Sequence, residues 1–260
     1  MKKFRLLLAL LPVLGLTSCL EILEDVTVNE NGSGEYLVSA EAGQIMNMVL
    51  SMGEDKDPAM TEKMKEKKDT SFSLLSTLKK DSVATPEEIE LFKNSTVHLK
   101  MDIENSVFTM ETRHPFTSPA NFNKLKSALT ALNKKTDNPI NKLLGGGDNG
   151  EGDEDPMSGI SGFGGEGFDL VMNGNSITRT LNQAKLDELS KSAGMEGLDE
   201  QSKTMFETIK YKTVFHLPSA ATVKDSKIME VSEDRKRVSF ENTLLQLFED
   251  PKTFVFTINY

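Results

Sequence analysis

The chain has 260 residues, a formal net charge of −10 and a hydrophobic content of 37%. Its acidic balance argues against nucleic-acid partners, because binding to phosphates depends on clustered lysine and arginine. Its length suits one large domain or two small ones, and the low apolar content predicts ordered parts interrupted by loose ones.

The first 19 residues have the layout of a secretory leader. A basic start at 2–5 and an almost wholly apolar run at 6–16 precede small Thr17 and Ser18, and then Cys19, the single cysteine of the chain. An apolar run this short does not span a bilayer, which needs about 20 residues. The pattern therefore predicts export.

The ending Leu16-Thr17-Ser18-Cys19 resembles the lipobox of bacterial lipoproteins. The resemblance implies that residues 1–18 are a lipoprotein signal peptide and that Cys19 carries diacylglycerol and palmitate, which anchor the chain in a membrane. Two other interpretations are an ordinary signal peptide with a coincidental cysteine and an uncleaved anchor.

Residues 19–135 are predicted to form the first part of an α+β domain that opens with a hairpin. Apolar and polar residues alternate over 20–28 and again over 35–40, as they do in half-buried strands. The run at 29–34 is rich in Asn and Gly, which is typical of a turn.

The next segment mixes an apolar helical pattern with charged stretches. Methionines at helical spacing over 45–52 predict a flexible core face rather than a copper site, because no histidine or cysteine accompanies them. Charged residues dominate 53–71, which predicts a solvated helix or a loose insertion. Thr85 and Pro86 are typical of the N-cap and first position of a helix.

A second hairpin and a helix follow. Residues 96–103 and 107–114 alternate as strands should, and Pro115 is expected to end the second strand. A helix is predicted to begin at Ser118-Pro119. Its apolar residues recur at helical spacing: Phe122, Leu125, Leu129 and Leu132.

Residues 136–167 are predicted to be a disordered, Gly-rich acidic insertion. Such a segment cannot bury enough apolar surface to offset its ordering entropy. The acids lack the spacing of an EF-hand calcium loop, and no Gly-Lys-Ser/Thr follows the glycines as it does in a phosphate-binding loop.

Residues 168–260 are predicted to be the second, β-rich part of the domain. Asn173-Gly174 lies between two alternating runs and is the strongest hairpin signal in the chain. The remaining predictions are helices within 182–207, a strand at 211–217, a hairpin of 222–231 with 237–242, and a closing strand at 252–260.

These patterns together predict an α+β fold in which an antiparallel sheet has its helices packed on one face. Hairpin turns and single-face alternation favour antiparallel pairing. We expect strands within 20–40, 95–114, 168–180 and 211–260 to share one sheet.

The sequence carries no catalytic, metal or cofactor motif, which predicts a protein that is not an enzyme. His98, His114 and His216 share no local spacing of a zinc site, so surface or structural roles are expected for them. A nucleophile elbow, a His-Glu-x-x-His helix and a Walker loop do not occur.

Two segments resemble the LppM-like family of bacterial envelope lipoproteins. They are the run DVTVNENGSGEY at 25–36, soon after the lipobox cysteine, and the strand ending Phe215-His216-Leu217-Pro218. The resemblance implies a mixed α+β domain on the outer side of a membrane that handles lipid or glycolipid. The chain departs from the family in its glycine-rich insertion and in lacking a C-terminal transmembrane segment.

The expected function is that of a cell-envelope lipoprotein with a non-enzymatic binding or assembly role. The ligand would be a lipid or glycolipid held between the sheet and its Met- and Leu-rich helices; the alternative is a scaffold lipoprotein that binds an envelope protein. Leu20 rather than Asp follows Cys19, which favours the outer membrane, facing the periplasm or the surface. Glu21, Glu24 and Asp25 are the candidate for an acid-rich surface-export signal.

Overall fold

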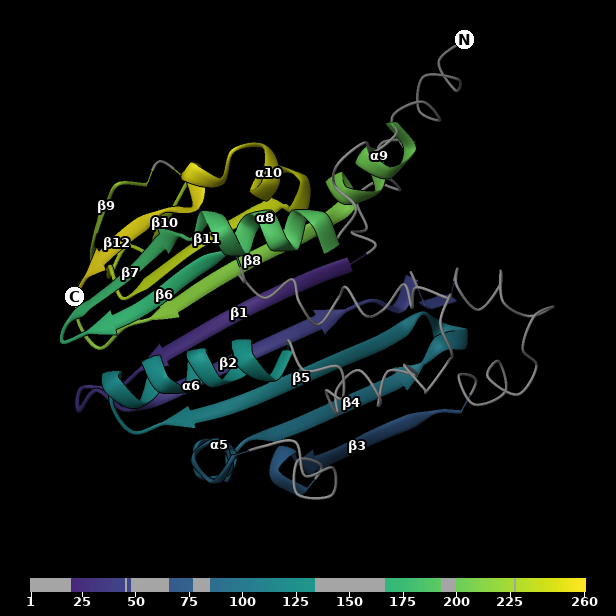
Figure 1. Ribbon diagram of the computed structural model, residues 1–260, viewed down its shortest axis with the longest axis horizontal. Helices are drawn as coiled ribbons and strands as arrows, with labels where there is room; N and C mark the ends of the chain where they lie inside the picture. The colour runs from purple at the N-terminus through teal and green to yellow at the C-terminus, as the bar shows by residue number, and fades with distance from the viewer. Residues whose placement is uncertain are drawn as a thin grey trace, which may run out of the picture.

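The computed structural model describes residues 20–44, 46–47, 66–76, 85–133, 167–192, 200–226 and 228–260. They build an eight-stranded sheet of order β10-β11-β8-β1-β2-β5-β4-β3 and a four-stranded sheet of order β6-β7-β12-β9 (Figure 1). The predicted α+β class is confirmed. The insertion predicted at 136–167 lies outside the described residues, apart from Gly167.

The long sheet grows from the N-terminal hairpin. β1 and β2 pair antiparallel with Val26 opposite Tyr36, as the alternation predicts, and Gly32 in the turn has a φ of 78°. Alternate residues of β1 from Leu20 to Val28 are buried. The strands of this sheet are β1 (Leu20–Val28), β2 (Gly34–Glu41), β3 (Lys68–Ser73), β4 (Thr96–Asp102), β5 (Val107–Phe116), β8 (Ile209–His216), β10 (Glu230–Val231) and β11 (Arg237–Thr243).

The prediction of one purely antiparallel sheet is wrong in two respects. β1 pairs parallel with β8, with Leu20 opposite Ile209 and Thr27 opposite His216. The strands at 168–180 belong to the second sheet, which consists of β6 (Phe168–Asn173), β7 (Ser176–Leu181), β9 (Thr222–Lys224) and β12 (Phe256–Asn259). Periodicity shows which face of a strand is apolar, but it does not identify the strand's neighbour.

Three local predictions also need correction. Lys68–Ser73, expected to lie largely in a solvated or loose segment, form the edge strand β3. The predicted hairpin of 222–231 with 237–242 is limited to β10 and β11, because β9 pairs with β12. β5 continues through Pro115, whose only strand neighbour is β2, because β4 begins opposite Arg113. A proline is tolerated where one side of the ladder is open.

Helices form where the sequence supplies caps. Thr85 and Glu88 make a complete capping box at the start of α5 (Pro86–Phe92), and Thr243 and Gln246 make another at α10 (Leu244–Glu249). The helix expected to begin at 118–119 is α6 (Pro119–Asn133); of its predicted apolar face, Phe122, Leu125 and Leu132 are buried and Leu129 is partly buried. The remaining helical segments are α8 (Gln183–Ser192), α9 (Glu200–Thr208), η2 (Ile103–Asn105) and η4 (Pro251–Phe254).

The core lies on one face of the long sheet, which we call the inner face. Over β8 and β11 it is covered by the small sheet, where the rings of Phe215 and Phe256 lie 5.5 Å apart. Over β2 and β5 it is covered by α6, where Phe122 packs against Tyr36 and Phe116. Figure 1 shows α5, α6 and α8 on the same side of the long sheet as β6 and β7. The predicted packing of helices on one face is thus confirmed for the described residues.

Candidate functional site

A cluster of polar side chains lies buried between the layers, and its centre is the carboxylate of Glu24. Tyr36 donates a hydrogen bond to Oε1 of Glu24 at 2.5 Å, and Tyr211 donates one to Oε2. Lys126 from α6 donates to Oε1 at 3.1 Å and to the Tyr36 hydroxyl at 2.8 Å. Arg179 from β7 donates to the Tyr211 hydroxyl at 3.1 Å, and its Nη1 lies 4.0 Å from Oε2.

The position of Glu24 follows from strand periodicity. It has the same parity as the buried Ile22 and Val26, so β1 directs its carboxylate into the core, where the residue is 2% exposed. Arg179 reaches the cluster from the small sheet, and its guanidinium lies 4.4 Å from the centre of the Phe168 ring. The cluster therefore joins the two sheets and α6 at one point.

The electrostatics of the cluster keep Glu24 ionised. Burial alone would raise the pKa of Glu24, but Lys126, Arg179 and the two tyrosine hydroxyls outweigh it, and the pKa lies below its ordinary value. Burial, together with the neighbouring carboxylate, raises the pKa of Tyr36 well above its usual range. The cluster is an ion pair with hydrogen-bonded hydroxyls, sealed from solvent except at Lys126, and it suits a structural role.

His114 is a second buried polar group on the inner face. Its Nδ1 lies 2.9 Å from the hydroxyl of Ser95, and its ring lies 6.2 Å from those of Tyr36 and Phe92. Burial and the nearby Lys126 charge lower the pKa of His114 from 6.5 to about 3. This histidine is neutral at physiological pH and packs in the core, which agrees with the structural role expected from the sequence.

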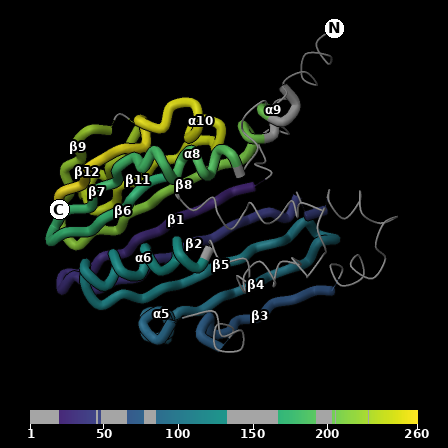
Figure 2. The backbone as a smooth tube through the Cα atoms, in the orientation of Figure 1, coloured from purple at the N-terminus to yellow at the C-terminus, as the bar shows by residue number. Residues whose placement is uncertain are grey.

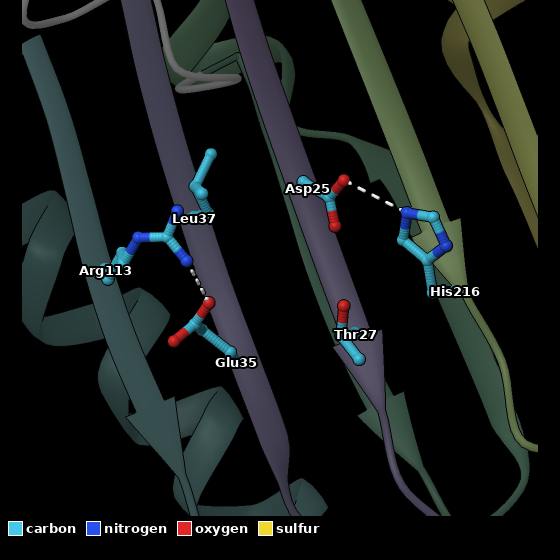
Figure 3. A pocket seen from close by; sticks show the side chains of 6 residues that line it. All are labelled: Asp25, Thr27, Glu35, Leu37, Arg113 and His216. Carbon is cyan, nitrogen blue, oxygen red and sulfur yellow. Dashed lines mark hydrogen bonds and ion pairs between the residues drawn. The ribbon is translucent and has the colours of Figure 1, made fainter.

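The other face of the long sheet, the outer face, carries an open groove of about 400 Å³ over β5, β2, β1 and β8 (Figure 3). Thr27 of β1 and Leu37 of β2 line its middle, between β5 and β8. On one side Asp25 and His216 lie 3.1 Å apart, from Oδ2 to Nε2. Figure 3 views the sheet from this face, with helices behind the strands.

Arg113 and Glu35 form the opposite side of the groove. Nη1 of Arg113 donates to Oε1 of Glu35 at 2.9 Å, while its Nε donates to Oε1 of Glu111 at 2.6 Å. Five of the six lining residues are polar, and Leu37 alone is apolar. The groove thus offers hydrogen-bond donors and acceptors of both charges on a rigid sheet, which suits a polar ligand.

The structure disperses the residues that the sequence singled out. His98 lies on the outer face beside Asp69, His114 in the core and His216 in the groove. In the described residues, no group of three or more His, Cys, Asp or Glu side chains is placed to hold a metal ion. Cys19, the predicted lipid-bearing residue, lies outside the described residues.

Sequence reasoning missed the buried cluster, although a signal for it was present. Glu24 and Arg179 each occupy a position whose strand parity is otherwise apolar. A charged residue at such a position indicates a buried partner. Because Glu24 has this role in the core, an acid-rich export signal in the folded protein would rest on Glu21 and Asp25.

No helix in the described ranges is long and apolar enough to cross a membrane. Comparison with family models, curated proteins and solved structures finds no match to the chain. The LppM-like resemblance therefore rests on the two sequence segments alone.

Proposed function

We propose that the chain is a membrane-anchored lipoprotein of the bacterial cell envelope with a non-enzymatic binding role. The lipobox cysteine supports the anchor, and the outer-face groove supports the binding role. The single observation that carries the proposal is that the strand directly following the lipobox cysteine also contributes residues to the groove. β1 begins immediately after Cys19 and contributes Asp25 and Thr27 to the groove.

The chemistry of the groove favours a polypeptide partner over an acyl chain. It contains two carboxylates, one guanidinium, one imidazole and one hydroxyl, with Leu37 as the one apolar side chain in its lining. Charged pairs that remain open to water contribute orientation and specificity in protein recognition. A partner segment with basic or hydroxyl donors would complement Asp25 and Glu35. This assignment corresponds to a scaffold or protein-interaction lipoprotein.

A lipid or glycolipid ligand is the second candidate, and the inner face favours it. Methionine and other apolar side chains line β4 and β5 on that face, and methionine adapts to irregular apolar guests. The residues concerned are Leu99, Met101, Phe108 and Met110, each buried.

The anchor is tested by separating the full-length protein in a detergent that forms two phases. We expect the wild type to enter the detergent phase and Cys19→Ala to remain unprocessed or to enter the aqueous phase. Intact mass should place the wild-type start at a lipid-modified Cys19. A wild type that stays in the aqueous phase would show that the anchor assignment is wrong.

The partner is tested by placing a photo-crosslinking amino acid in the groove at Leu37 in the cells that make the protein. The matched control carries the same amino acid at Lys100, an exposed position of β4 beyond the groove. We expect one discrete crosslinked protein from Leu37 and none from Lys100, with the product lost when Glu35→Lys is added.

Native mass spectrometry of residues 20–260, after incubation with an envelope lipid extract, distinguishes lipid binding from a polypeptide partner. A bound lipid at up to equimolar amount, together with an absent or Glu35-independent crosslink, would favour lipid binding over a polypeptide partner. A discrete crosslink without bound lipid would favour the scaffold role.

A further inference from the structure

No linker separates the predicted anchor at Cys19 from the start of β1. Leu20 is the residue directly after Cys19, yet it is 1% exposed and already lies in the ladder opposite Ile209. The next residue, Glu21, is paired with Glu41 of β2 on the other side of the strand. The chain is therefore fixed from both sides within two residues of Cys19.

Because neighbouring Cα atoms are about 3.8 Å apart, a lipid on Cys19 would be joined to a buried residue of the central sheet by one peptide unit. A tether of that length does not let the domain move away from the bilayer or turn freely above it. We infer that the domain docks directly on the lipid surface with the end of the long sheet at which β1 begins. The inference rests on the lipid anchor proposed above.

The strand directions define which elements lie at that end. β8 runs parallel to β1 and starts there, and β2 runs antiparallel and ends there. Figure 2 shows the start of β1 and the turn between β1 and β2 at opposite ends of the sheet. Glu41 is thus near the proposed bilayer contact, and Glu30 in the turn is remote from it.

This orientation places the groove away from the lipid. Asp25 and Thr27 lie about 16 and 23 Å along the strand from Leu20, at about 3.3 Å per residue. The groove therefore opens sideways into the aqueous compartment, and its ligand reaches it from that compartment. The partner of the sheet end is the bilayer surface, and the partner of the groove is a separate, soluble or protruding molecule.

The test uses the single cysteine of the natural chain. Once Cys19 carries lipid, a new cysteine is the only free thiol and accepts a fluorophore specifically. The matched pair is Glu41→Cys and Glu30→Cys. Each replaces an exposed glutamate of the same hairpin, and the two positions lie at opposite ends of it. Each lipidated, labelled protein is reconstituted into phosphatidylcholine vesicles that contain a headgroup spin-labelled lipid.

We expect the spin label to quench most of the fluorescence at position 41 and almost none at position 30. Insertion of about 20 Gly and Ser residues between Cys19 and Leu20 would provide a tether with a mean reach of about 25 Å and should abolish the difference. Equal quenching at the two positions without that insertion would overturn the docking inference and leave the anchor intact. A protein that does not bind the vesicles would overturn the anchor, and the inference with it.

Discussion

Replacing Glu24 with glutamine is expected to lower the free energy of unfolding by about 3–5 kcal/mol, the usual cost of removing one partner from a buried ion pair. The amide retains the size of the side chain but removes its negative charge. Arg179, which is 2% exposed, then loses the carboxylate that compensates for its lost hydration within the described part of the chain. Urea unfolding of residues 20–260 measures the change.

Glu21→Gln is the matched control, because Glu21 lies on the same strand with its side chain on the outer face. Its substitution should change the unfolding free energy by less than about 0.5 kcal/mol. The double variant Glu24→Gln/Arg179→Met should lose clearly less stability than the two single losses combined, since the charges are removed together. Strictly additive losses would contradict the proposed coupling of these two side chains.

Acidification from pH 7 to pH 4.5 is expected to destabilise the protein by about 3 kcal/mol through His114 alone. The pKa of this group is about 3 in the folded chain and 6.5 in an unperturbed histidine. Above pH 6.5 both states hold a neutral ring, so this group leaves stability unchanged. Between pH 6.5 and about 3 the unfolded chain binds a proton that the folded chain does not, so stability falls as the pH falls.

The measurement is the slope of unfolding free energy against pH between 7 and 5.5, a range about one pH unit above the ordinary pKa of the carboxylates. His114→Gln should remove most of that slope, whatever its effect on stability at pH 7. The exposed His98→Gln serves as the control and should retain the slope of the wild type. A His114→Gln variant with an unchanged slope would show that another group binds the proton.

Local structure was predictable from the sequence where the signal itself is local. The turn with Asn173-Gly174 and the capped helix at Thr85 depend on residues a few positions apart, and both form as expected. The pairing of β1 with β8 joins residues that are far apart in the chain, and no periodicity encodes it. The edge strand β3 was missed because its charged, exposed residues lack apolar alternation.

The candidate groove shows the same limit. Its residues come from four strands, and each of them sits at an ordinary outward position of its own strand. Alternation predicts that Asp25 and Arg113 face solvent, but only the sheet order brings them to the two sides of one groove. The buried cluster differs, because Glu24 and Arg179 each stand out within their own strand as a charged residue at an otherwise apolar position.

The parallel pairing of β1 with β8 bears on the export that we propose. When the N-terminal part of a chain crosses a membrane first, β1 and its neighbour β2 arrive early. The strand that pairs with the other edge of β1 is β8, and it arrives only with residues 209–216. Closing so large a loop is slow, and during that time an unpaired strand edge can associate with other chains. For the export proposed above, the same delay would keep the precursor from folding before translocation. Synthesis order and topology would then leave completion of the sheet to the compartment that receives the chain.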